Sequence, residues 1–293
     1  MFYFSVPLGK LVRRVSRLRG GGSALPGLVV EKIDPGFMRR TLSTLPHGVA
    51  VVSGTNGKTT TTKMVVELLE SQGLKVFTNR TGSNFTRGVA AALIGEVDWR
   101  GRLNADVAVL ELDEAHAVHF VNQVPPRYCL LLNVLRDQLD RFGEIDKTAQ
   151  LLQHIASKTT GTVVLNREDP RVARIAETLK AETPKSGTPA GPEVLYFGLD
   201  DSLLSTFPND DEMRAAPGSP VPPAPAKPHA DVVLRRVGAA DADFEYDGVT
   251  ATTAMKLRGV YNIFNAAAAL TLARSICGSG AAAADQATLL TAL

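Results

Sequence analysis

A glycine-containing loop that ends in a lysine and two threonines has the residue types needed to bind phosphate. It reads Ser53-Gly54-Thr55-Asn56-Gly57-Lys58-Thr59-Thr60. The backbone N–H groups of such a turn can surround a phosphate, and the positive end of a following helix adds to the attraction. Lys58 can reach the β- and γ-phosphates of a nucleoside triphosphate, and the Thr59 hydroxyl can bind Mg²⁺. The loop therefore predicts a nucleoside triphosphate site.

The loop departs from the usual pattern for such sites at one position. G-x-x-x-x-G-K-[ST] requires glycine at position 52, where this chain has Val52. A chance glycine turn before a helix is the alternative interpretation. The stretch Asn166-Arg167-Glu168-Asp169 is similar to the Asn-Lys-x-Asp guanine motif, but arginine replaces the lysine and no Asp-x-x-Gly motif is present. We therefore do not expect a GTPase.

A second candidate for the site is Glu111, at the end of the apolar run 107–112 and followed by Asp113 and Glu114. In P-loop proteins a carboxylate at the end of a neighbouring strand holds Mg²⁺. We expect Glu111 to bind Mg²⁺ together with Thr59. The alternative is a solvated acidic strand end, since exposed carboxylates are common without a metal.

The elements that must position these residues alternate between short apolar runs and helical stretches. Strands are predicted at 49–52, 75–77, 107–112, 128–133, 162–166 and 194–197, and helices at 58–72, 87–94, 145–157, 171–179, 263–276 and 285–293. Strands without alternation of apolar and polar residues are covered on both faces, as in parallel sheets. The pattern predicts an α/β fold with a mostly parallel P-loop sheet flanked by helices.

The last part of the chain has a different character. Six of the twelve residues from Pro217 to Pro228 are proline, which favours an extended loop. Antiparallel strands are predicted at 232–237, 244–246 and 249–253, the last two joined by an Asp247-Gly248 turn. We expect a small antiparallel β annex that follows a proline-rich insert at 199–230.

Composition excludes several classes of protein. The 293 residues carry 32 basic and 30 acidic side chains, a net charge of +2 that gives no reason to expect nucleic acid as a partner. Cys129 and Cys277 are the two cysteines, too few for a disulfide framework or a four-cysteine zinc site. No apolar run is long enough to cross a bilayer, and the N-terminus lacks the order of a signal peptide. We expect a cytoplasmic protein.

The N-terminal segment has the pattern of a basic amphipathic helix. Apolar side chains recur at helical spacing at Leu8, Leu11, Val12, Val15 and Leu18, opposite the basic residues Lys10, Arg13, Arg14, Arg17 and Arg19. Such a helix can lie on an anionic membrane. The alternative is a surface helix packed on its own domain. The pattern thus allows peripheral contact with the inner face of the membrane.

Four of these segments together resemble the central ATP-binding domain of the Mur ligase family. They are residues 54–60, 111–114, 165–170 and 259–267, the last reading Gly-Val-Tyr-Asn-Ile-Phe-Asn-Ala-Ala. Residues 136–146 and 19–27 are similar to the MurT-type branch of the family. The resemblance covers about residues 10–198 and 231–293.

The resemblance implies the chemistry. Mur-type enzymes use ATP and Mg²⁺ to convert a carboxylate into an acyl phosphate, which an amine then attacks. By position Lys58 and Glu111 would be catalytic, and Thr59 and Glu111 would bind Mg²⁺. The residues expected to bind ATP are Gly54, Thr55, Asn56, Gly57, Lys58, Thr59, Thr60, Asn262 and Asn265. The two asparagines would face the adenine or ribose, and capping of a helix N-terminus is their alternative role.

For the MurT-type branch, the resemblance implies amidation of the D-glutamate α-carboxyl in the lipid II stem peptide to D-isoglutamine. The ammonia would come from a GatD-type class I glutamine amidotransferase in a heterodimer. Two alternatives remain open: a Mur or folylpolyglutamate-type ligase with an amino acid as nucleophile, and a nucleotide-binding module without catalysis. Leu152 stands near the position of the carbamylated lysine of several amino-acid-adding Mur ligases, which argues against the first.

The sequence also departs from the family pattern. Asp137-Gln138-Leu139-Asp140 lacks the histidine that helps other members to bind a second metal, so a second Mg²⁺ is left open. The insert at 199–230 has no cysteine, so we predict no zinc. We expect a leader at residues 1–45, the ATP-binding domain at 46–293, and the family's C-terminal domain absent from this chain.

Overall fold

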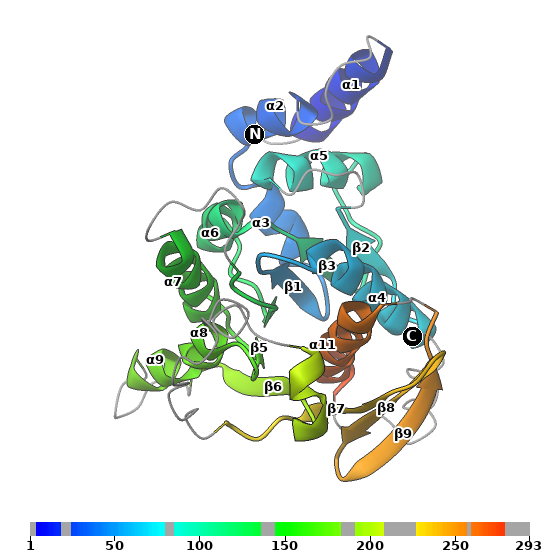
Figure 1. The fold of residues 1–293 in the computed structure, drawn as a ribbon. Coiled ribbons are helices and arrows are strands. Elements are labelled where there is room, and N and C mark those ends of the chain that lie inside the picture. The colour runs from blue at the N-terminus through cyan, green and yellow to red at the C-terminus, as the bar shows by residue number, and fades with distance from the viewer. Residues whose placement is uncertain are drawn as a thin grey trace.

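The computed structural model describes residues 4–18, 25–79, 85–135, 144–182, 191–207, 227–256 and 259–278. They form one nine-stranded sheet with helices against both of its faces (Figure 1). The strand order is β2-β3-β1-β4-β5-β6-β7-β8-β9, and β2 to β7 are parallel in this order. The predicted α/β class with a mostly parallel sheet is therefore confirmed.

The strands are short and largely buried. Their bounds are β1 Gly48–Ser53, β2 Val76–Thr78, β3 Val107–Glu111, β4 Tyr128–Leu131, β5 Thr162–Asn166, β6 Glu193–Leu199, β7 Val232–Val237, β8 Asp241–Tyr246 and β9 Val249–Ala254. Successive side chains of a strand point to opposite faces. In β1, Val49 and Val51 belong to one core and Ala50 and Val52 to the other.

The helices divide between these two cores. The core that contains Val49 lies under α2 Leu25–Ile33, α3 Phe37–Leu42, α5 Thr86–Glu96, α6 Glu114–Gln123, α7 Glu144–Ser157, α8 Pro170–Ala173 and α9 Ile175–Glu182. The other core lies under α4 Lys58–Ser71 and α11 Val260–Cys277, which pack on each other, with the 3-10 helix η1 Asp201–Thr206 at its side. At the outer surface, α1 Ser5–Leu18 packs on α2 and α5 (Figure 1).

The antiparallel annex is continuous with the main sheet. β7 pairs in parallel with β6 and antiparallel with β8, so one strand joins both parts. The predicted hairpin turn is present, with positive φ at both Asp247 (51°) and Gly248 (74°), as a type I′ turn requires. β8 begins at Asp241, three residues before the predicted start.

Several elements differ from the sequence prediction. Helices α2, α3, α6 and η1 were not predicted, and α6 begins where the Asp113 side chain accepts a hydrogen bond from the Ala115 N–H. The predicted helix at 285–293, most of the proline-rich insert and the Asp137–Asp140 stretch lie outside the described residues.

No helix of the described residues combines the length and apolar character needed to cross a membrane. Cys129 is buried in β4, and burial raises the pKa of its thiol to about 12. Cys277 is half-buried. Within the described ranges, no three side chains of histidine, cysteine, aspartate or glutamate gather as a metal site.

Candidate functional site

The 53–60 loop connects β1 to α4 at the carboxyl edge of the parallel strands. Two of its residues have positive φ, Gly54 at 134° and Gly57 at 87°. A Cβ on Gly54 would lie 3.0 Å from the Asn133 nitrogen, and a Cβ on Gly57 would lie 2.8 Å from Asn265 Nδ2. Glycine is therefore required at both positions by backbone conformation and by space.

The Lys58 side chain folds back over the loop. Its Nζ donates to the carbonyl oxygens of Gly54 at 2.5 Å and Thr55 at 3.1 Å, and lies 3.8 Å from Glu114 Oε1. The ammonium group is thus held against the backbone of the loop whose N–H groups are predicted to surround a phosphate. Glu114 was not among the predicted site residues, although it follows Glu111 closely in the sequence.

Thr59 and Glu111 meet at the edge of the sheet. The Thr59 hydroxyl donates to Glu111 Oε1 at 2.7 Å. The pairing of β1 with β3 sets Val52 beside Glu111 and brings the end of β3 to the loop. A hydroxyl and a carboxylate that converge in this way are the oxygen donors that Mg²⁺ prefers. The two predicted metal ligands are therefore adjacent.

Glu111 is held by a residue that sequence reasoning missed. Asn79, directly after β2, donates from Nδ2 to the Glu111 carbonyl at 2.8 Å and accepts from the Glu111 N–H through Oδ1 at 3.0 Å. These two bonds fix the backbone at the end of β3. An asparagine after a strand at the same sheet edge was the signal that could have identified it.

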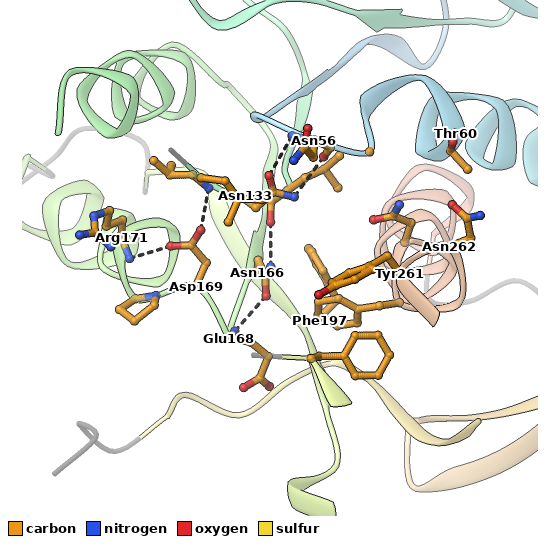
Figure 2. Close-up of a pocket in the computed structure, with 18 residues that line it drawn as sticks. Asn56, Thr60, Asn133, Asn166, Glu168, Asp169, Arg171, Phe197, Tyr261 and Asn262 are labelled. Carbon is orange, nitrogen blue, oxygen red and sulfur yellow. Dashed lines mark hydrogen bonds between the residues drawn. The ribbon is translucent and has the colours of Figure 1, made fainter. Parts of the chain in front are cut away.

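Asn133 makes the same kind of paired contact with the phosphate loop (Figure 2). It accepts from the Asn56 N–H at 2.9 Å and donates to the Asn56 carbonyl at 3.0 Å. The Asn133 carbonyl also accepts from the Thr55 N–H at 2.9 Å. The residue follows β4, the strand beside β1, and was likewise missed. It fixes the backbone of the loop from the side.

A cavity of about 520 Å³ opens beside the loop. That volume lies in the range of small-molecule sites. On the side of the loop the cavity is lined by Asn56, Gly57 and Thr60. The rest of the lining is part polar and part aromatic (Figure 2). The polar side includes Asn133, Asn166, Glu168, Asp169 and Arg171, and the aromatic side is Phe197, Phe207, Tyr261 and Phe264.

Asn262 and Asn265 both line this cavity, at the start of α11. The helix begins at Val260 after Gly259, so neither asparagine occupies the capping position that was the alternative. Asn265 lies against Gly57 and so joins α11 to the start of α4. Tyr261 packs edge to face against Phe207, with 5.8 Å between the two ring centroids. Contact with a nucleotide remains a prediction for both asparagines.

The stretch that is similar to a guanine motif has a different role. Asn166 donates to the Leu132 carbonyl at 2.8 Å, and Asp169 accepts from the Val134 N–H at 2.6 Å while capping α8 (Figure 2). Burial raises the pKa of Asp169, and the backbone N–H groups that it accepts from oppose that rise. These residues tie the end of β5 to the segment after β4 and build the polar side of the cavity.

We expect Asn133→Ala to weaken nucleotide binding by up to about thirtyfold, because two hydrogen bonds that hold the loop backbone are lost, each contributing about 1 kcal/mol. Fluorescence titration with a labelled ATP analogue measures the loss. Asn104→Ala, an exposed asparagine that accepts from Lys75, is the matched control. Equal affinity of the two variants would contradict the positioning role of Asn133.

Comparison with known proteins agrees with this geometry. Residues 52–194 match the model of the Mur ligase middle domain. The chain contains a Mur ligase middle domain. The resemblance to the Mur ligase family is therefore confirmed, and the loop, Glu111, Asn133 and the Asn166–Asp169 stretch all lie inside the matched residues.

Two proteins of known name are similar in sequence to this chain. The chain is 33% identical over 172 residues to the MurT subunit of lipid II isoglutaminyl synthase (glutamine-hydrolysing) from Staphylococcus aureus, covering 58% of this chain and 38% of that protein. It is 30% identical over 233 residues to the UDP-N-acetylmuramoylalanine–D-glutamate ligase of Bordetella parapertussis, covering 78% and 42%. The chain thus spans less than half of the length of both relatives.

Among solved structures, MurF ligase from Thermotoga maritima in complex with ADP superposes with a TM-score of 0.58 at 21% identity. The match covers 84% of this chain and 49% of that one. At this level of identity the comparison shows that the fold is shared.

Proposed function

We propose that the chain is the ATP-binding part of a ligase that activates a carboxylate as an acyl phosphate. The observation that supports this most is that Lys58, Thr59 and Glu111 come together at the loop that borders the cavity. ATP would place its phosphates in the 54–60 loop and its adenosine in the cavity, between Asn262, Asn265 and the aromatic side. A MurF ligase of the same fold has been solved in complex with ADP, which supports an adenine nucleotide as the ligand.

Residues 53–60 would do little covalent chemistry themselves. Lys58 would neutralise charge on the transferred phosphoryl group and hold it in line with the attacking carboxylate oxygen. Thr59 and Glu111 would hold Mg²⁺, which when bound offsets the negative charge of the phosphate oxygens. Glu114, 3.8 Å from Lys58 Nζ, would keep the ammonium group in place until ATP enters.

For the substrate, we propose the D-glutamate α-carboxyl of the lipid II stem peptide. Ammonia released from glutamine by a GatD-type amidotransferase subunit would attack the acyl phosphate and give D-isoglutamine. The similarity to MurT, a subunit of a glutamine-hydrolysing lipid II isoglutaminyl synthase, supports this choice. Such a reaction belongs to peptidoglycan synthesis and to the cytoplasm, where ATP is present.

A second candidate is a ligase that joins an amino acid to the activated carboxyl. The similarity over 233 residues to a D-glutamate-adding ligase favours it. The buried Leu152 of α7 argues against it, because the lysine that several such enzymes carry near this position is missing.

One assay separates the candidates. The protein at its full natural length is incubated with ATP, lipid II, glutamine and a co-expressed amidotransferase, or with single amino acids in place of the last two. We expect a product that has lost one negative charge, formed when both subunits and glutamine are present. ADP release driven by an amino acid, without amidation, would overturn the proposal and support the second candidate.

Glu111→Gln tests the metal site. The amide keeps an acceptor for the Thr59 hydroxyl but loses the charge, so we expect the Mg²⁺ concentration for half-maximal turnover to rise by about tenfold or more. Turnover at saturating Mg²⁺ should fall by about 10²-fold. Glu67→Gln, on the exposed side of α4, should change neither value. An unaltered Mg²⁺ dependence in Glu111→Gln would remove Glu111 from the metal site.

A further inference from the structure

Helix α1 exposes a continuous apolar row. The row and its exposed fractions are Phe4 81%, Leu8 39%, Leu11 58%, Val15 41% and Leu18 82%. The spacing places all five side chains on one face of the helix. Amphipathic helices of globular proteins usually turn such a face toward the core. Here the side chains of the row are exposed, and α1 lies in the outermost layer of the described structure (Figure 1).

The opposite face of α1 carries small side chains, some of them polar, and packs tightly on the protein. Ser5, Gly9 and Ser16 are buried there. A Cβ on Gly9 would lie 2.7 Å from Val30 Cγ2 of α2, and the Ser5 hydroxyl donates to Asp34 Oδ2 at 3.0 Å. These contacts fix the rotation of the helix about its axis. The outward direction of the apolar row is therefore a specified feature of the fold.

The charged residues of α1 are all of one sign. Residues 5–18 include four basic residues and no acidic residue; the basic ones are Lys10, Arg13, Arg14 and Arg17. Trp99, in the loop after α5, is 71% exposed and lies beside α1, with Lys10 Nζ 5.5 Å from its ring centroid. Arg100 and Arg102 are exposed in the same loop. An exposed indole and several cations thus lie on or next to the helix that carries the apolar row.

We propose that the apolar row of α1, Trp99 and the neighbouring basic side chains form a docking surface for an anionic lipid bilayer. Apolar side chains would enter the boundary between headgroups and acyl chains, with the helix lying in the plane of the membrane. Lys10, Arg14 and Arg100 would face lipid phosphates, and each such cation near an anionic surface adds to binding. Tryptophan is typical of this interfacial depth.

The charge pattern favours lipid over a second copy of the chain. A symmetric contact between two α1 helices would bring cations of both copies together, with no acidic residue in the helix to offset them. A bilayer rich in anionic lipid supplies the opposite charge along the whole row. The surface is independent of the proposed function, because binding to vesicles needs neither nucleotide nor substrate.

The chain carries its own probe for the test. Trp99 is its single tryptophan, so its fluorescence reports on this surface. On addition of phosphatidylglycerol vesicles we expect a blue shift of the emission and sedimentation of the protein with the vesicles. Phosphatidylcholine vesicles should give much weaker binding, and raised salt should weaken the binding to phosphatidylglycerol. No shift and no sedimentation with phosphatidylglycerol would overturn the proposal.

Substitutions in the row make the test specific. Leu11→Asp and Leu18→Asp change exposed side chains, so the fold should remain, and each should lower partitioning onto phosphatidylglycerol by about tenfold or more. Val249→Asp, at a similarly exposed valine of β9, should leave partitioning unchanged. Equal losses in all three variants would contradict the assignment. So would a concentration-dependent dimer that Leu11→Asp dissociates, because the row would then bind a second copy.

Discussion

Replacement of Lys58 by alanine is expected to lower ATP turnover by about 10²–10³-fold, the loss typical of one charged or hydrogen-bonding group at a reacting centre. The ammonium group is bonded to the Gly54 and Thr55 carbonyls of the loop in which we propose that the ATP phosphates bind. Removal of the ammonium group would leave the negative charge of the γ-phosphate without this cationic partner. Steady-state ADP release measures the effect, and circular dichroism with thermal unfolding checks that the variant is folded.

The same helix offers a matched control. Lys63 lies on the exposed side of α4, away from the loop. Lys63→Ala removes the same charge and the same side chain, so it should leave turnover unaltered. Equal turnover of a folded Lys58→Ala variant and the original chain would remove the phosphate-site assignment.

The second large effect is expected for Gly57→Ala. Its φ of 87° disfavours any Cβ, and the added atom would lie 2.8 Å from the Asn265 amide. We expect a loss of about 2–4 kcal/mol in the free energy of unfolding, combining backbone strain with overpacking. Nucleotide affinity should fall by more than about 10²-fold, since the loop and the cavity are both displaced. Urea unfolding and calorimetric titration measure the two losses.

Gly73→Ala separates strain from contact. Gly73 has nearly the same φ, 80°, at the other end of α4, but a Cβ there would meet no atom within 4 Å. We expect a loss of about 1 kcal/mol from strain, with full nucleotide affinity. In the double variant Gly57→Ala/Asn265→Ala, part of the lost stability should return. Indistinguishable behaviour of Gly57→Ala and Gly73→Ala would show that contact with Asn265 has no part in the effect.

The loop and most of the parallel sheet were predictable because their signals are local. A strand of β-branched residues followed by Gly-Lys-Thr and a helix can be recognised within about twenty residues around Gly57, and this pattern indicates a phosphate-binding loop. Glu111 was identified for the same reason, as the acidic end of an apolar run. The structure then brings Thr59 and Glu111 to 2.7 Å through the pairing of β1 with β3.

The rest of the candidate site depends on strand order, which no local pattern reveals. Asn79 and Asn133 act because β2, β3, β1 and β4 are neighbours in that order. The aromatic side of the cavity joins Phe197 and Phe207 to Tyr261 and Phe264, more than fifty residues further along the chain. No pattern in the sequence next to any of these side chains marks it as part of a site. Only the tertiary arrangement assembles them.

The missed elements have physical reasons as well. In β8, Asp241, Asp243 and Glu245 point outward and pair with Arg235 and Arg236, so the acidic side chains hid the first three residues of a strand whose other face is buried. Helix α2 contains Pro26 and Gly27, which count against a helix in sequence reasoning. Gly27 is nevertheless needed, because a Cβ there would meet the Arg87 carbonyl of α5 at 1.9 Å.

Transfer of oxygen tests the central claim, carboxylate activation by ATP at the loop of residues 53–60, most directly. The acceptor carboxyl of the lipid II stem peptide is labelled with ¹⁸O, and the protein at its full natural length turns it over with ATP, glutamine and the amidotransferase subunit. An acyl phosphate intermediate requires one labelled oxygen to leave with the inorganic phosphate, and we expect one ¹⁸O in each phosphate released. Phosphate without the label, released while amide forms, would contradict the account.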